Sequence, residues 1–118
     1  MYSAAFLFEP GEYDARFHEL NARIDAAAKA TPGYLGRESW RSPDGRTANA
    51  TYYWESLEAL KKFSMHPDHL AAKREYAKWY RGYHIVIAQV LRAYGDGRLQ
   101  HITPNERRER CERIDRSS

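Results

Sequence analysis

The chain has 118 residues and a mass of 13.8 kDa, which fits one domain with one hydrophobic core. Of its 19 basic and 16 acidic residues, six arginines and four acids lie from Arg98 onward. Residues 1–97 therefore hold 13 basic and 12 acidic residues, a net charge of only +1. They lack the basic surplus of a nucleic-acid-binding domain. The single cysteine, Cys111, excludes an intrachain disulfide, and the short apolar runs exclude a signal peptide and a membrane span, so we expect a cytoplasmic protein.

The N-terminal third predicts a strand, a helix and a second strand. Residues 2–8 form a nearly continuous apolar run, typical of a buried strand, which Pro10-Gly11 interrupts. Residues 34–40 are predicted to form the second strand. Between the two strands, apolar residues recur at helical spacing as far as Thr31-Pro32-Gly33, where the helix should end: Tyr13, Phe17, Leu20 and Ile24.

The middle of the chain predicts a third strand and two helices. Ser42-Pro43-Asp44-Gly45 is a turn signal, and residues 47–54 follow it as a strand that places Tyr52 and Trp54 on one face. Ser56 can cap a short helix whose buried face is predicted to hold Leu57, Leu60 and Phe63. Pro67 suits the first turn of another helix, predicted to run to about Tyr80 with Gly82 as its stop.

The order of these elements predicts the fold class. With a last strand over residues 83–94, the order is β-α-β-β-α-α-β, an α+β ferredoxin-like plan with an antiparallel sheet. The first and last strands look apolar on both faces, so the face without helices should stack on the same face of a second copy, which predicts a homodimer. Residues 1–97 are the predicted domain, and residues 98–118 a charged tail that fits a solvated helix, a disordered extension or an arm over a partner.

Several motifs resemble those of one family. They are Tyr53-Trp54-Glu55-Ser56-Leu57-Glu58-Ala59-Leu60, then His69, then Trp79-Tyr80-Arg81-Gly82-Tyr83, then Val90-Leu91-Arg92-Ala93-Tyr94. Together they resemble the antibiotic biosynthesis monooxygenase family of the dimeric α/β-barrel superfamily, well over residues 47–95 and by element order before that. The resemblance implies two sheets stacked into a dimeric α/β barrel. It also implies a small cofactor-free monooxygenase that oxidises an aromatic or polyketide-like phenol with molecular oxygen.

The candidate site residues lie on one helix and one strand. At about 100° per residue, His69, Lys73, Tyr76 and Tyr80 share one face of the predicted helix. An imidazole can take a phenol proton near neutral pH, so His69 is the candidate base, with Trp54 as the second candidate catalytic residue. Small aromatic molecules would contact the substrate-binding candidates Tyr52, Lys73, Tyr76 and Tyr80. The same side chains also fit an ordinary aromatic core.

Other interpretations of the same residues stay open. His66 and His69 form a His-x-x-His pair, but Pro67 splays them and a third ligand is missing, so we predict no metal site. His84 could line the pocket or a dimer interface, and a structural role is favoured. In a second hypothesis His69 ligates heme iron in a heme-binding or heme-degrading protein, although the first strand lacks the asparagine of the heme degraders. A third hypothesis is a non-catalytic dimer that binds a small ligand.

Overall fold

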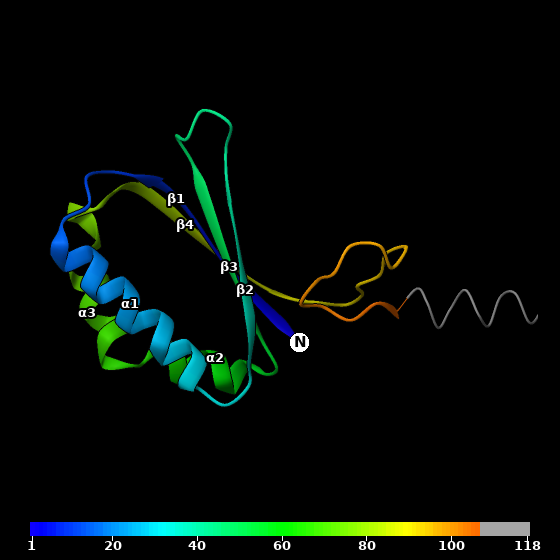
Figure 1. Cartoon of the computed structure of the whole chain (residues 1–118). Helices are drawn as coiled ribbons and strands as arrows, with labels where there is room; N and C mark the ends of the chain where they lie inside the picture. The colour runs from blue at the N-terminus through cyan, green and yellow to red at the C-terminus, as the bar shows by residue number, and fades with distance from the viewer. Residues whose placement is uncertain (107–118) are drawn as a thin grey trace, which may run out of the picture.

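The structure, a computed structural model, describes residues 1–106. Its four strands form one antiparallel sheet in the order β2-β3-β1-β4, and the helices cover one face of that sheet (Figure 1). The predicted ferredoxin-like α+β fold is confirmed. The elements are β1 (Tyr2–Pro10), α1 (Ala15–Ala30), β2 (Tyr34–Arg41), β3 (Ala48–Trp54), α2 (Leu57–Ser64), α3 (Pro67–Glu75), the 3₁₀ helix η1 (Tyr76–Lys78) and β4 (Tyr80–Gln89). Cys111 and the Arg-rich part of the predicted tail lie outside the described residues.

Strand register decides which side chains face the helices. Ala4 of the central strand β1 lies opposite Tyr52 of β3 and Ile87 of β4, so these three share the helix-covered face with their i±2 neighbours. Leu7 lies opposite His84, and both belong to the other face. Tyr52 and Trp54 therefore lie on one face, as their alternation predicted, and that face is the inner surface of the sheet.

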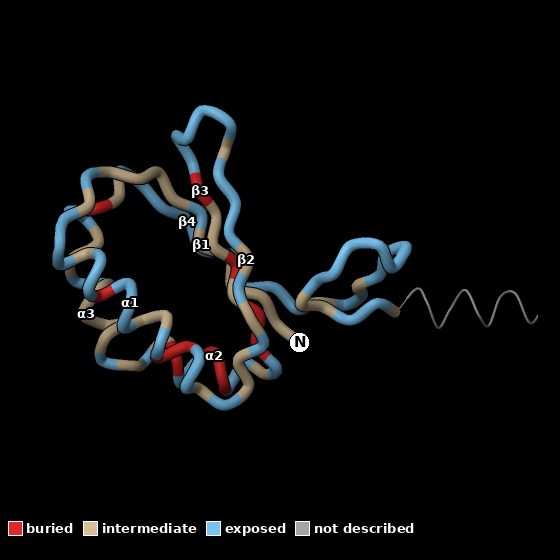
Figure 2. Tube along the Cα trace, viewed as in Figure 1, coloured by how far each residue is buried: buried red, intermediate tan, exposed pale blue. Residues whose placement is uncertain are grey.

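The best-buried part of the core lies at one end of the molecule. There Trp54 and Ala28 are fully buried, and Leu60 and Phe63 of α2 pack against them. Figure 2 shows buried positions in and around α2. The prediction that Leu57 belongs to this buried face is wrong, because Leu57 is exposed at the first position after the cap Ser56. Burial thus concentrates where α2 and the end of β3 meet.

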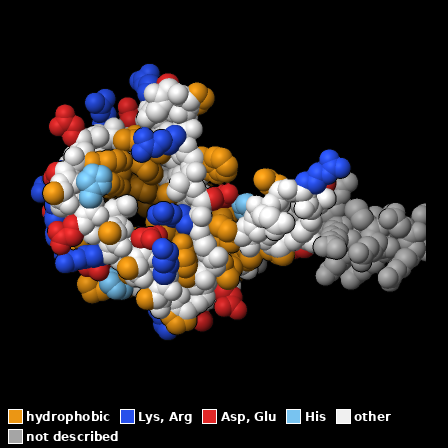
Figure 3. Space-filling view, viewed as in Figure 1, with side chains coloured by type: hydrophobic (Ala, Val, Ile, Leu, Met, Phe, Trp, Pro, Cys, Tyr) orange, Lys and Arg blue, Asp and Glu red, His pale blue; other side chains and the backbone are white. Residues whose placement is uncertain are grey.

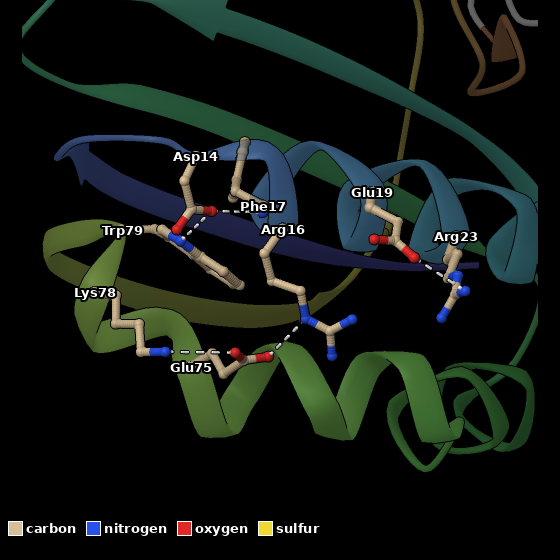
Figure 4. Close-up of polar contacts among 8 residues, drawn as sticks. All are labelled: Asp14, Arg16, Phe17, Glu19, Arg23, Glu75, Lys78 and Trp79. Carbon is tan, nitrogen blue, oxygen red and sulfur yellow. Dashed lines mark hydrogen bonds and ion pairs between the residues drawn. The ribbon is translucent and has the colours of Figure 1, made fainter.

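The connection from α3 to β4 differs from the sequence prediction. The α-helix ends at Glu75 rather than near Tyr80, and β4 begins at Tyr80 rather than residue 83. The buried Trp79 causes the turn, because its Nε1 donates to Asp14 Oδ1 at 3.1 Å and its carbonyl accepts from the Gly11 amide at 2.6 Å (Figure 4). This contact with the start of α1 ends the helix although the local sequence would continue it.

Ion pairs support the same connection. Glu75 accepts from Arg16 of α1 at 3.3 Å and lies 3.6 Å from Lys78, so it links α1 to the end of α3 (Figure 4). Asp14 caps α1 through the Phe17 amide at 2.9 Å with the same oxygen that accepts from Trp79. Two elements that are distant in sequence are therefore fixed to each other at the corner where β4 starts.

The far end of β4 also differs from the prediction. The strand ends at Gln89 rather than residue 94, because its partner β1 begins at Tyr2 and Val90 pairs only with the Met1 carbonyl, at 3.0 Å. An edge strand cannot continue a ladder beyond its neighbour. Its apolar side chains on both faces are largely exposed in the single chain.

Residues 98–106 contact the face of the sheet that the helices leave open. His101 Nε2 lies 2.8 Å from Glu38 Oε2, and the Tyr53 hydroxyl donates to Glu38 Oε1 at 2.5 Å. Burial would raise the pKa of Glu38, but hydrogen bonds with Tyr53 and His101 hold it below its usual range. The predicted domain boundary at residue 97 stays a prediction. Among the described helices, none combines the length and hydropathy that a membrane crossing requires.

Candidate functional site

A cavity of about 540 Å³ lies between the sheet and the helices. Its wall is mostly aromatic and aliphatic, and apolar side chains show inside the hollow between α1 and the sheet (Figure 3). The volume falls within the range of small-molecule sites, which are largely apolar with a few polar groups. All six candidate site residues belong to the wall of this one cavity: Tyr52, Trp54, His69, Lys73, Tyr76 and Tyr80.

The His69 ring lines this cavity, with one of its nitrogens shielded. The ring meets the Phe63 ring edge-on at 4.8 Å, and its Nδ1 is buried without a hydrogen-bond partner of full geometry in the described chain. Burial, and then the nearby charge of Lys73, lower the pKa of His69 to about 4, and the Ser64 backbone opposes this shift. The imidazole is therefore neutral at neutral pH and can accept a proton, but it does not titrate near neutrality as the sequence suggested.

The lowered pKa of His69 makes folding stability depend on pH. The unfolded chain binds this proton below its ordinary pKa of 6.5, whereas the folded chain binds it only near pH 4. The contribution of His69 to the free energy of unfolding is thus fully present above pH 6.5. It falls by about 2 kcal/mol as the pH drops to 4, after allowance for partial solvent screening. Urea unfolding at pH 7 and at pH 4.5 gives the free energy of unfolding that each protein loses between the two pH values. We expect this loss to be smaller in His69→Asn than in the wild-type protein by about the same amount. Equal losses in the two proteins would contradict the assigned pKa.

Trp54 brings a second unpaired polar atom to the cavity. The side chain is fully buried at the end of β3, between the rings of Tyr34 at 5.2 Å and Phe63 at 5.1 Å. Its Nε1 is buried without a partner in the described chain. A buried donor without a partner costs about 1–3 kcal/mol. Core packing alone leaves this donor unexplained.

Tyrosine hydroxyls supply most of the remaining polar lining. Burial raises the pKa of Tyr80, with further increases from Tyr13 and Tyr52, so its phenol stays neutral. The Tyr83 hydroxyl donates to the Tyr76 hydroxyl at 3.0 Å, and their rings meet at 4.6 Å. This pair spans from η1 to β4 along one side of the cavity. Neutral phenols can donate to substrate oxygens while their rings contact a flat ligand.

Several lining residues were missed by the sequence analysis, among them Tyr83 and Asn21. Tyr83 shares the inner face of β4 with Ile85 and Ile87, and alternation along the predicted strand over residues 83–94 was the available signal. Asn21 lies on α1 four residues after Phe17, and both line the cavity. Helical spacing from Phe17 was the available signal for Asn21.

The remaining histidine candidates lie apart from this arrangement. His66 caps α3, where its Nδ1 accepts from the Asp68 amide at 3.1 Å. His84 points to the opposite face of the sheet and does not line the cavity. Within residues 1–106, no three His, Cys, Asp or Glu side chains come together as metal ligands would.

Comparisons with known proteins relate this chain to oxygenases. The sequence model of the family described as "Monooxygenase af470-like" matches residues 9–88. YqjZ of Bacillus subtilis, a protein named as uncharacterized, is 35% identical over 92 residues, which are 77% of this chain and 80% of YqjZ.

Solved structures share the fold. SnoaB from Streptomyces nogalater, named as a cofactor-independent oxygenase, superposes in a mutant form with a TM-score of 0.66 and 16% identity, over 78% of this chain and 94% of SnoaB. A candidate antibiotic biosynthesis monooxygenase from Deinococcus radiodurans gives 0.67 and 16%, over 80% and 97%. A dabb family protein with a ferredoxin-like fold from Mesorhizobium loti gives 0.57 and 16%, over 76% and 96%.

Proposed function

The chain belongs to the af470-like monooxygenases, of the antibiotic biosynthesis monooxygenase type, and from this membership we propose that it oxidises an aromatic or polyketide-like phenol with molecular oxygen and without a cofactor. The observation that carries the proposal is the cavity of about 540 Å³, a mostly aromatic space whose wall includes all six candidate site residues, His69 and Trp54 among them. SnoaB, named as a cofactor-independent oxygenase, shares this fold and supports a reaction of that kind.

The reaction needs a base and a dry aromatic cavity. Neutral His69 accepts a proton from the substrate, and the resulting anion passes one electron to O₂. The two radicals combine through a new C–O bond, and the resulting peroxide anion takes the proton back from His69 to give a hydroperoxide. Loss of the second hydrogen from that carbon and cleavage of the O–O bond release water and leave a carbonyl. For an anthrone, the CH₂ group and O₂ become C=O and H₂O, so atoms and electrons balance.

The other lining side chains hold the anion in place. The buried Trp54 indole forms part of the wall against which the substrate packs. Burial raises the pKa of Tyr80, so this phenol keeps its proton and donates a hydrogen bond to a substrate oxygen, while the Tyr76 ring contacts the substrate. The apolar wall excludes water, which strengthens these contacts during the reaction.

Anthrone is a direct probe of this chemistry. With purified protein and no added metal or cofactor, we expect oxygen uptake and anthraquinone formation in a 1:1 ratio, with one atom of ¹⁸O₂ in the new carbonyl. Spontaneous oxidation in the absence of protein provides the background rate. A rate equal to that background with anthrone and with a dihydroxynaphthalene would overturn the proposed function.

We also propose that the protein acts as a homodimer through the sheet face opposite the helices. Leu7, Trp40 and Val86 are exposed on that face in the single chain, and a stacked second sheet would cover them. Light scattering should then give twice the chain mass of 13.8 kDa. A single-chain mass at micromolar concentration would contradict the stacked arrangement. The heme hypothesis stays a prediction.

A further inference from the structure

The cavity contains one formal charge at neutral pH. Among the side chains that line it in the described chain, none is Asp, Glu or Arg, and Lys73 is the one lysine. His69 is neutral there, because its pKa is about 4, and the raised pKa of Tyr80 keeps that phenol neutral. A neutral aromatic substrate would leave this cationic lining without a complement.

Lys73 differs from Lys29 and Lys78, which have ion pairs, and resembles Lys61 and Lys62 of α2, for which residues 1–106 supply none. Lys29 lies 3.0 Å from Asp25, and Lys78 lies 3.6 Å from Glu75. No carboxylate within residues 1–106 lies at ion-pair distance from Lys73. Its ammonium is therefore available to a ligand, because the two carboxylates of α3 lie beside other side chains: Asp68 beside His66, and Glu75 beside Arg16 and Lys78.

The position of Lys73 places this charge at the rim of the cavity. Lys73 follows His69 by four residues on α3, so the two side chains are neighbours on one face of the helix. Lys73 is exposed, whereas His69 Nδ1 is buried. A lysine in this position keeps its stem against the apolar wall and its ammonium near water. An acid group at the edge of a bound ring would meet it there.

We propose that the substrate is an aromatic phenol with an ionised carboxylate, which Lys73 binds at the cavity rim while the ring and hydroxyl occupy the interior beside His69. This inference rests on the proposed function and adds the charge class of its substrate. The ammonium donates charge-assisted hydrogen bonds to the carboxylate. Neutralising the Lys73 charge also removes one cause of the weak basicity of His69, so binding of the acid prepares the base.

The test compares an acid with its own neutral ester. Isothermal titration with 4-hydroxy-2-naphthoate and with its methyl ester gives the ratio of the two dissociation constants for each protein. We expect the wild-type protein to bind the acid about fivefold more tightly, a preference that shrinks as salt is raised, because Lys73 is exposed. Lys73→Met should bring the ratio near one. Arg74→Met, which removes the adjacent exposed cation that does not line the cavity, should keep most of it.

Each outcome decides a different statement. Tighter binding of the acid that disappears in Lys73→Met and persists in Arg74→Met supports the inference. Equal binding of acid and ester by the wild-type protein, or a preference that survives Lys73→Met, would overturn it and leave the proposed oxygenase standing. If neither compound binds, the inference falls together with the proposed aromatic substrate. Circular dichroism of both variants establishes that they are folded.

Discussion

His69→Ala is expected to lower the turnover of anthrone by about 10²–10⁴-fold, which is the usual contribution of a positioned base. His69 is the histidine that lines the cavity, and its imidazole is neutral at neutral pH, so it is the candidate proton acceptor there. Oxygen uptake and anthraquinone formation measure the effect. If His69 is the base, added imidazole should restore part of the rate, since the alanine leaves room for it, and a merely structural histidine would not respond.

The control for this substitution is His18→Gln. His18 is exposed on α1 and does not line the cavity, so its replacement should leave the rate within about twofold of wild type. Both variants should keep the wild-type circular dichroism spectrum. Unchanged turnover in His69→Ala would remove His69 from the mechanism and return the cavity to an ordinary aromatic core or a ligand-binding site.

Gly11→Ala is expected to destabilise the fold by about 2 kcal/mol, the typical cost of inserting a methyl group into a closed contact. A Cβ at Gly11 would lie 2.8 Å from the Trp79 carbonyl oxygen, and this oxygen is a backbone atom that accepts from the Gly11 amide. The backbone must therefore move at the corner where β4 begins. Urea unfolding measures the loss, and weaker binding of anthrone should accompany it, because Trp79 and Tyr80 line the cavity.

Gly82→Ala, on the strand β4 that begins at this corner, is the matched control. No heavy atom lies within 4 Å of a Cβ built at Gly82, and its φ is not positive. Alanine there should be neutral or slightly stabilising, because it reduces the conformational freedom of the unfolded chain. If the two alanine variants unfold at the same urea concentration, the close approach of Gly11 to Trp79 does not determine the corner.

Local periodicity was sufficient to group several candidate site residues that line one cavity in the folded chain. Alternation along β3 assigned Tyr52 and Trp54 to the inner face, and helical spacing placed His69 and Lys73 together on α3. Tyr80 is an instructive case, because it lines the cavity as predicted but from β4 rather than from a helix. Its helical phase agrees with that of His69, so the local pattern could not show that the helix ends five residues earlier.

The order of the elements, the α+β class and the inner faces of the strands follow from the amino-acid sequence, because hydrophobic periods of two and 3.6 residues express these features locally. The corner at Trp79 emerges only in the folded chain, where Gly11 and Asp14 contact a residue more than 60 positions away. The protonation state of His69 is likewise decided only in the folded chain, where the imidazole is a neutral acceptor rather than a group titrating near pH 7. Desolvation sets that pKa, and it depends on which distant elements enclose the ring.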